Sequence, residues 1–426
     1  MASVSDPTVQ PAHARIAVIS LHTSPLDQPG TGDSGGMNVE IRALSNGLAD
    51  RGVAVDVYTR CAGRGVPQVD VIYRLTRVIQ VPAGPCAPVG KGDLPGLVPT
   101  FVDSVVARAE AEGPYDLVHA HYWLSGRAAA VAKARWRVPL VASFHTLGQV
   151  KNLAEGIEAP EPAVRLEGER DAVLAADRIL VPTRQEAANL ATLYGADPAR
   201  IRVVPPGVDA ERFRPLNREE AKASLGLSGR VALFLGRLQP LKGPDVAIRA
   251  VAEARRLAPD TTEDLTLAVI GGPSGEDGPA FVSGLRRLAA EQGIGDRVRF
   301  LQSRPHEDLP VAYSAAEVLL MPSRTESFGL AALEAQACGV PVVAAAVGGL
   351  RSVVAHGMSG FLVPGHHPGP YAAHLVEILE DPSLAGRLSA AARERASAFS
   401  WDQAAAGVLD AYAELIPEVL APSRAS

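Results

Sequence analysis

The sequence predicts an α/β protein of two domains, each built on a doubly wound parallel sheet. Three observations support this prediction. The chain has 426 residues, which is too many for a single hydrophobic core. Short runs that are apolar on both faces alternate with amphipathic helical stretches almost from end to end, as they do in covered parallel sheets. A stretch rich in proline and glycine, Val204–Pro215, interrupts this alternation and is the expected linker.

Composition and charge narrow the class of protein. Hydrophobic residues make up 47% of the chain and charged residues 21%, as in ordinary globular proteins. The net charge of −6 offers no basic excess for binding nucleic acid, and no apolar run approaches the roughly 18 residues of a membrane span. Residues 1–13 lack the pattern of a signal peptide and are expected to be a loose tail. We therefore expect a cytoplasmic enzyme that binds neither nucleic acid nor a membrane.

The three cysteines, Cys61, Cys86 and Cys338, are widely scattered along the chain. An odd number at such spacings is typical of a reduced cytosolic protein rather than of a disulfide scaffold. The cysteines also form no zinc-like cluster. We therefore expect all three to be reduced.

The expected elements fall into three parts of the chain. In the first domain, residues 1–206, a helix runs from Met37 to Arg51, and strands are expected at Arg15–Leu21, Ala54–Thr59, Leu117–His121, Leu140–His145 and Ile179–Pro182. In the second domain, residues 207–400, strands are expected at Val231–Leu235, Leu265–Ile270, Val298–Leu301, Val318–Pro322, Val342–Ala346 and Gly360–Val363. Residues 401–426 hold a helix, Trp401–Ile416, which is expected to cross back to the first domain. Because parallel sheets bind ligands at the carboxyl ends of their strands, the expected active site is the cleft between the domains.

A glycine-rich loop follows the first expected strand. Gly30–Gly35 matches the G-x-G-x-x-G pattern, but eight residues separate it from the strand end near Leu21, so the loop is too long to seat a dinucleotide in the usual way. Gly35 and Gly36 instead allow close approach of the backbone to another ligand, and the amides that open the Met37 helix suit a phosphate. A flexible loop is the alternative. Polar side chains in the same span argue against it: His22, Gln28, Asp33 and Asn38.

Two cations stand on the loop after the strand Val231–Leu235. Arg237 and Lys242 suit a diphosphate, because arginine engages two oxygens at once and lysine adds a point charge. The loop is not a Walker motif, since Gly243 follows the lysine where serine or threonine is needed. A solvated surface turn is the alternative. We favour binding, because loops at strand ends often carry function.

Two glutamates lie eight residues apart after the strand Val318–Pro322. Glu326 is in the expected loop, and Glu334 is inside a helix that opens near Gly329. The amides at Gly329 and Leu330 would face a phosphate, while Glu334 would accept hydrogen bonds from ribose hydroxyls. A solvent-facing carboxylate is the alternative for Glu334. Its apolar neighbours favour a partly buried carboxylate, which needs a partner.

These features together resemble the retaining glycosyltransferases of family four, which have the GT-B fold. The glutamate pair, the two cations, the two Rossmann-like units and the late crossover helix carry this resemblance. An N-terminal signature narrows it to the D-inositol-3-phosphate glycosyltransferases of mycothiol biosynthesis. The matching segments are His22–Pro25, Gln28–Val39, His121–Gly126, Val150–Asn152 and Gly271–Gly275. The resemblance covers nearly the whole chain, apart from the first dozen residues and the extreme C-terminus.

The resemblance implies transfer of N-acetylglucosamine from UDP-N-acetylglucosamine to 1D-myo-inositol 3-phosphate, with retention and release of UDP. The implied donor contacts are Gln28, Pro29, Gly36, Arg237, Lys242, Arg304, Glu326 and Glu334. The implied acceptor contacts are His22, Asp33, Ser34, Gly35, Gly36, Met37, Asn38, Lys91, Tyr122, Thr146 and Arg165. The residue types agree, since Lys91 and Arg165 are cationic and Tyr122 and Thr146 offer hydroxyl donors to a phosphate monoester.

Retention suggests either a carboxylate nucleophile or attack on the same face as the departing group. We expect front-face attack, because no carboxylate on the acceptor loops is an obvious nucleophile and Glu326 is better explained as orienting the donor. Arg237, Lys242 and the Gly329 helix terminus would stabilise the departing UDP. His145 would hold the sugar or stabilise the transition state; a core histidine is the alternative. The expected catalytic residues are Arg237, Lys242, Glu326 and His145.

The resemblance further implies a homodimer and a magnesium site, built largely from backbone, near Tyr313, Ser314, Ala316 and Val340. GT-B enzymes generally need no metal for chemistry, so we expect no required cofactor. Three alternative functions stay open. They are a family-four enzyme with another donor or acceptor, an inactive nucleotide-sugar-binding protein, and a nicotinamide-dependent oxidoreductase.

Overall fold

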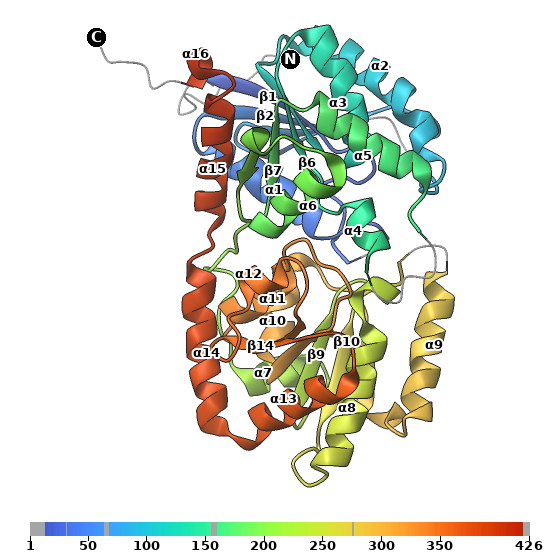
Figure 1. The fold of residues 1–426 in the computed structure, drawn as a ribbon, viewed down its shortest axis with the longest axis vertical. Coiled ribbons are helices and arrows are strands. Elements are labelled where there is room, and N and C mark those ends of the chain that lie inside the picture. The colour runs from blue at the N-terminus through green and yellow to red at the C-terminus, as the bar shows by residue number, and fades with distance from the viewer. Residues whose placement is uncertain (1–12, 31, 64–67, 155–159, 275–276, 421–426) are drawn as a thin grey trace, which may run out of the picture.

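The computed structural model describes residues 13–420, except 31, 64–67, 155–159 and 275–276. The tail expected at residues 1–13 therefore lies almost wholly outside the described residues, and so do Thr31 and Gly275 of the signature segments. Two α/β units are stacked along the longest axis of the molecule, the blue-green unit above the yellow-orange one (Figure 1). The predicted class, two doubly wound sheets, is confirmed.

The first sheet has eight strands in the order β3-β4-β2-β1-β5-β6-β7-β8. Every neighbouring pair is parallel except β3 with β4, an antiparallel hairpin at the edge that the sequence analysis did not predict. The strands are β1 (Ala14–Ile19), β2 (Val53–Arg60), β3 (Val69–Tyr73), β4 (Thr76–Val81), β5 (Leu117–His121), β6 (Leu140–Ser143), β7 (Arg178–Val181) and β8 (Ile201–Val203). The helices are α1 (Gly36–Ala49), α2 (Leu94–Glu112), α3 (Trp123–Trp136), α4 (Gly148–Asn152), α5 (Ala163–Ala175) and α6 (Arg184–Tyr194).

The second sheet has six parallel strands in the order β11-β10-β9-β12-β13-β14. They are β9 (Val231–Leu235), β10 (Thr266–Ile270), β11 (Val298–Leu301), β12 (Val318–Met321), β13 (Val342–Ala345) and β14 (Gly360–Val363). The helices are α7 (Arg218–Ser224), α8 (Pro244–Leu257), α9 (Gly278–Glu291), α10 (Leu309–Ser314), α11 (Leu330–Ala337), α12 (Leu350–Val353), α13 (Pro368–Glu380) and α14 (Pro382–Ser397). Each predicted strand of this sheet matches an observed one to within a residue at either end.

Alternate residues of each central strand enter cores on opposite faces of its sheet, which is why these strands are apolar throughout. In β1, Ile16 and Val18 join one buried cluster while Ala17 and Ile19 join another. In β9, Leu233 joins one cluster and Ala232 and Phe234 the other. Burying a large apolar side chain contributes about 1.5–3 kcal/mol, so both faces of each sheet must be covered by helices.

The chain crosses back to the first unit after α14. α15 (Trp401–Ala413) begins after Ser400, whose hydroxyl accepts a hydrogen bond from the amide of Gln403, and α16 (Pro417–Leu420) follows it. α14 and α15 run in succession along one side of both units (Figure 1). α15 packs on α1, and the Tyr412 hydroxyl lies 2.8 Å from Nδ1 of His119 on β5. α15 is thus part of the core of the first unit.

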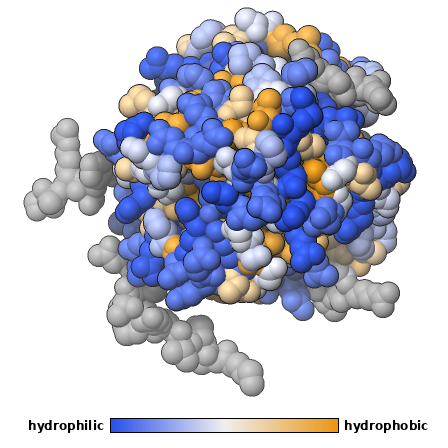
Figure 2. Space-filling view, turned by 90° about the horizontal axis from the view of Figure 1, so that it is seen from below, coloured by the Kyte–Doolittle hydropathy of each residue, from blue (hydrophilic) through white to orange (hydrophobic). Residues whose placement is uncertain are grey.

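The surface at the end of the second unit is predominantly hydrophilic, with apolar residues scattered across it (Figure 2). None of the helices formed by the described residues is both long enough and apolar enough to cross a membrane.

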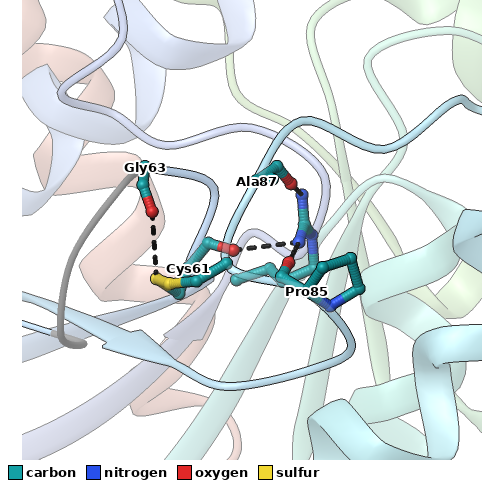
Figure 3. The surroundings of a disulfide bond; sticks show 6 residues. Cys61, Gly63, Pro85 and Ala87 are labelled. Atoms are coloured by element: carbon teal, nitrogen blue, oxygen red, sulfur yellow. Dashed lines mark hydrogen bonds between the residues drawn. A yellow bond between two sulfur atoms is a disulfide. The ribbon is translucent and has the colours of Figure 1, made fainter.

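The expectation that all three cysteines are reduced is wrong for two of them. Cys61 follows β2, Cys86 follows β4, and a disulfide joins them, with 5.0 Å between their Cα atoms (Figure 3). The physical reason is topological: β2 and β4 are parallel neighbours, so the segments that leave them emerge at the same edge of the sheet. The odd number of cysteines concealed this pair. Cys338 is free and buried.

Candidate active site

A cavity of about 1090 Å³ lies between the two units, at the carboxyl ends of β1, β6, β9 and β12. Both units line it, as the strand-end rule for parallel sheets leads one to expect. Its volume is sufficient for a nucleotide sugar together with a small acceptor. The cleft between the units is therefore the candidate active site.

The wall formed by the second unit carries the two predicted cations. Arg237 follows β9, and Lys242 ends a short 3-10 turn, Pro240–Lys242. The Lys242 Nζ lies 2.5 Å from Oε2 of Glu326, which stands on the loop after β12. The next residue, Gly243, has a φ of 69°, and a Cβ there would meet the Pro322 carbonyl oxygen at 2.2 Å. Only glycine fits this turn, which brings the lysine up to the glutamate.

Glu334 lies on α11 and is partly buried, as predicted, with His306 and Tyr313 as its hydrogen-bonding partners. Its side chain is 7% exposed, one oxygen lies 2.6 Å from Nε2 of His306, and the other accepts a hydrogen bond from the Tyr313 hydroxyl at 2.7 Å. α11 begins after Gly329, and both Gly329 and Glu334 line the cavity. The helix therefore presents its positive N-terminal end to the cleft.

The wall formed by the first unit carries a buried arginine. Arg165 on α5 is 5% exposed and lies 2.9 Å from Glu161 and 2.9 Å from Glu169. One of its nitrogens donates to the Thr146 hydroxyl at 3.0 Å, and the guanidinium lies over the Tyr122 ring at 5.3 Å. Two carboxylates therefore hold this cation at the edge of the cavity, next to two hydroxyl groups.

An ion chain links the two walls. Lys91 Nζ lies 2.6 Å from Oδ1 of Asp33, and Nη1 of Arg237 lies 4.0 Å from the same oxygen. The same loop contacts the second unit at Gly36, where a Cβ would meet Cδ1 of Leu330 at 3.1 Å. The glycine-rich loop of the first unit thus lies directly against the second.

The structure brings most of the predicted site residues together around the cavity. Those that line it are His22, Pro29, Asp33, Gly35, Gly36, Met37, Lys91, Tyr122, His145, Thr146, Arg165, Arg237, Lys242, Arg304, Glu326 and Glu334. Three do not line it. Gln28 is exposed, whereas Ser34 and Asn38 are buried and hydrogen-bond to the Thr23 hydroxyl, so they shape the glycine loop from behind.

Comparison with known proteins agrees with this arrangement. Residues 34–212 match the model of Glycosyltransferase Family 4, and residues 217–395 match that of Glycosyl transferases group 1. The chain is 48% identical over 413 residues to D-inositol 3-phosphate glycosyltransferase 2 of Catenulispora acidiphila, covering 96% of each chain. It is 49% identical over 412 residues to D-inositol 3-phosphate glycosyltransferase of Thermomonospora curvata, covering 94% of this chain and 95% of that one.

The chain belongs to the D-inositol 3-phosphate glycosyltransferase family. Among solved structures it resembles sucrose-phosphate synthase from Thermosynechococcus elongatus, with a TM-score of 0.88 and 33% identity over 95% of this chain and 100% of that one. Anabaena HepE in complex with UDP and glucose has a TM-score of 0.74 at 23% identity, over 95% of this chain and 100% of that one. These likenesses establish the GT-B fold.

His145 has a strained backbone, and its imidazole ring already contacts another histidine. The sequence analysis placed it in a strand, but β6 ends at Ser143 and His145 has a φ of 61°, which is rare outside glycine. Its Nε2 lies 2.8 Å from Nδ1 of His121, and its carbonyl accepts a hydrogen bond from the Ser327 hydroxyl of the other unit. Burial lowers the pKa of His145 to about 3, so the ring is neutral at pH 7.

Two carboxyl groups of the cavity wall, Glu40 and Glu186, escaped the sequence analysis. Glu40 lies 3.7 Å from Nδ1 of His145, and Glu186, 6% exposed, leaves its Oε1 without a hydrogen-bond partner among the described residues. Burial raises the pKa of each to about 8, and for Glu186 the nearby charge of Glu40 adds to this effect. Both line the cavity. Each sits on an amphipathic helix, where a glutamate normally signals only a solvated face.

The residues of the implied magnesium site offer few free side-chain ligands, and the site stays a prediction. Ser314 accepts a hydrogen bond from the Leu216 amide, and the Tyr313 hydroxyl donates to Glu334. Ala316 and Val340 are buried and offer only backbone carbonyls. Magnesium prefers carboxylates and water in octahedral geometry, and the described residues contain no group of three or more histidine, cysteine, aspartate or glutamate side chains placed to hold a metal. We derive no step through a metal.

The buried carboxyl of Glu186 predicts a pH-dependent stability. Its folded pKa of about 8 lies above the ordinary 4.5, so its contribution to the free energy of unfolding is complete below pH 4.5 and is lost as the pH rises through 8. We expect Glu186→Gln to match the wild-type protein at pH 5 and to exceed its unfolding free energy by about 2–4 kcal/mol at pH 8.5. Urea unfolding at both pH values measures this difference.

Glu167→Gln, an exposed change on α5, is the matched control and should leave the pH dependence unaltered. Parallel stability curves for the wild-type protein and Glu186→Gln between pH 5 and 8.5 would contradict the assignment.

Proposed function

We propose that this protein transfers N-acetylglucosamine from UDP-N-acetylglucosamine to 1D-myo-inositol 3-phosphate, with retention of the anomeric configuration and release of UDP. The names of its curated relatives support the acceptor. The observation that carries the proposal is the facing pair of cationic sites, Arg237 with Lys242 on one wall of the cavity and Lys91 with Arg165 on the other. Two separate anions fit such a cleft.

The wall of the second unit suits the nucleotide diphosphate. Arg237 and Lys242 would neutralise the charge that develops on the departing UDP, helped by the N-terminal end of α11. Glu334 would accept hydrogen bonds from the ribose, and Glu326 would orient the sugar while it holds Lys242. The bound UDP in the complex of the structural neighbour HepE, a protein of the same fold, is consistent with this use of the cleft.

The wall of the first unit suits a phosphate monoester. Arg165 is oriented by two carboxylates, while the hydroxyl groups of Tyr122 and Thr146 stand beside it. Lys91 lines the same cavity from an exposed loop. A dianionic phosphate would thus meet two cations and two hydroxyl donors.

The protonation of Glu40, the carboxyl group beside His145, favours front-face attack over a covalent intermediate. Glu40 stands beside His145, but its pKa of about 8 leaves it mostly uncharged at pH 7, so it is a poor nucleophile. Glu326 is already paired with Lys242. We propose that the acceptor hydroxyl attacks on the side of the departing phosphate, whose oxygen takes the proton. The cytoplasmic location and the homodimer stay predictions.

The function is tested by following UDP release from the purified protein with alternative substrates. With UDP-N-acetylglucosamine we expect rapid release in the presence of inositol 3-phosphate and little with unphosphorylated inositol, because only the phosphate engages Lys91 and Arg165. UDP-glucose serves as the competing donor, because the structural likeness to sucrose-phosphate synthase makes a different sugar donor the main alternative. Faster turnover with UDP-glucose, or equal turnover with both acceptors, would refute the assignment.

Arg237→Ala and Lys242→Ala should each lower kcat by about two orders of magnitude or more, the scale of a lost transition-state donor. The acceptor KM should change little, because both cations face the donor. Steady-state kinetics measures this, and Arg255→Ala, in the last turn of α8 and outside the cavity lining, is the control. Near-normal kcat in both variants would remove charge stabilisation from the mechanism.

Arg165→Ala should weaken binding of inositol 3-phosphate by about 2–5 kcal/mol, because it removes a desolvated charge partner of the phosphate. It also leaves Glu169 buried without its cation, so stability must be measured in parallel. Calorimetry with inositol 3-phosphate checks the affinity, and Arg170→Ala, exposed on the same helix, is the control. An unchanged affinity in a folded Arg165→Ala protein would exclude Arg165 from the acceptor site.

A further inference from the structure

The loop between β4 and α2, residues 82–93, carries Lys91 at its far end. The Lys91 side chain is 57% exposed and meets Asp33 across the mouth of the cavity. Such a side chain gains little from its own packing, so its reach toward a ligand depends on where the backbone of the loop is held. The anchors of this loop therefore bear on acceptor binding.

Two anchors converge on Cys86. The disulfide ties Cys86 to Cys61 at the end of β2. Arg60, 6% exposed, donates to the carbonyls of Pro85 and Ala87, both at 2.8 Å, and to that of Cys61 at 2.9 Å. Figure 3 shows the carbonyls of Pro85 and Ala87 turned toward one side chain, close to the cysteine pair. Arg60 thus grips the backbone on either side of Cys86, while the disulfide fixes Cys86 itself.

Beyond Ala87 the loop is more lightly held. The next backbone hydrogen bond in the described part of the chain runs from the Asp93 amide to the Gly90 carbonyl, within the turn that leads into α2. Pro88 and Gly90 are exposed, and Val89 only partly packs against the core of the first unit. The direction in which the chain leaves the Cys86 anchor therefore sets the position of Lys91.

We propose that Cys61 and Cys86 are positioning residues for the acceptor, whose disulfide holds Lys91 within reach of the acceptor phosphate and makes acceptor affinity depend on the redox state of the pair. This inference rests on the proposed function, because it assumes that Lys91 binds that phosphate. Arg60 keeps the loop attached in the reduced state, so reduction loosens Lys91 without unfolding the site.

The redox step balances with a low-molecular-weight thiol as reductant. Cys61 is 2% exposed whereas Cys86 is half-buried, so a thiolate attacks the Cys86 sulfur and Cys61 leaves as a thiolate that takes up a proton. A second thiol attacks the mixed disulfide. Two reductant thiols become one small disulfide while the protein gains two thiols. The reverse exchange with a small disulfide restores the bond.

The test compares the full-length protein, oxidised and reduced with dithiothreitol, with Cys61→Ser and Cys86→Ser. We expect reduction, or either substitution, to raise the KM for inositol 3-phosphate about 3–10-fold, the cost of ordering a loosened side chain and loop. The kcat should stay within about twofold and the Kd for UDP should not change. A merely structural role would alter all three together. Dithiothreitol should have no further effect on either variant.

Two controls make the result specific. Cys338→Ala, which removes the free buried thiol, should keep the full response to dithiothreitol. Lys91→Ala should raise the acceptor KM and abolish the response, because the disulfide acts through Lys91. Thiol titration confirms the oxidation state of each sample.

The outcomes separate the two proposals. Turnover with a KM that is the same in the oxidised and reduced protein would overturn the positioning role alone. Three titratable thiols in the folded protein under oxidising conditions would overturn it as well. Absence of turnover with inositol 3-phosphate in both states would overturn the proposed function and, with it, this inference.

Discussion

The site depends on one constraint: a cation that lines the cleft must be held in place before its ligand arrives. Each cation that we propose to bind an anion has a carboxylate neighbour. Lys242 lies against Glu326, Arg165 lies between Glu161 and Glu169, and Lys91 lies against Asp33. These contacts hold the long side chains in place at a low cost in conformational entropy. An incoming phosphate therefore meets cations that are already oriented.

The same ion pairs also connect the two units. Asp33 interacts with Lys91 of one wall and with Arg237 of the other. A phosphate that draws one of these cations away from Asp33 therefore changes the electrostatic interaction of Asp33 with the other. The chain crosses between the units twice, and the two crossings touch: the Val208 amide donates to the Phe399 carbonyl, and Gly207 packs against Ser400 so closely that a Cβ would clash with its backbone. A change in the angle between the units must bend the chain at this point.

The sequence predicted the central elements well because their patterns are strong. β5, β9, β11 and β14 match the expected strands residue for residue, since each is an apolar run bounded by helices or turns. The edge strand β3 escaped because its exposed residues weaken the apolar signal, and β8 escaped because three residues are too few to show a period.

The cavity-lining residues were predicted where a motif or the resemblance named them, and missed where tertiary packing alone creates the environment. Arg237, Lys242 and Glu326 stand on strand-end loops that the sequence already marks as functional. No local sequence pattern shows that Glu40 on α1 and Glu186 on α6 are close enough to interact electrostatically. Likewise, no local pattern shows that β2 and β4 are neighbouring strands, which bring Cys61 to Cys86. These relations depend on strand order, which composition and periodicity do not determine.

The protonated state of those two glutamates, which burial causes, suits the ligands proposed for the cleft. The proposed ligands, a nucleotide diphosphate and a phosphate monoester, would bring several negative charges into a small volume, and further carboxylates facing them would oppose each of them. The carboxylates of the ion pairs, such as Glu326 and Asp33, oppose the anions less because the cations beside them offset their charge. Burial raises the pKa of Glu40 and Glu186 to about 8, so both are mostly uncharged at pH 7 and act there as neutral hydrogen-bonding groups. As the pH rises past 8 they acquire charge, and that charge opposes both the fold and the binding of the proposed anions.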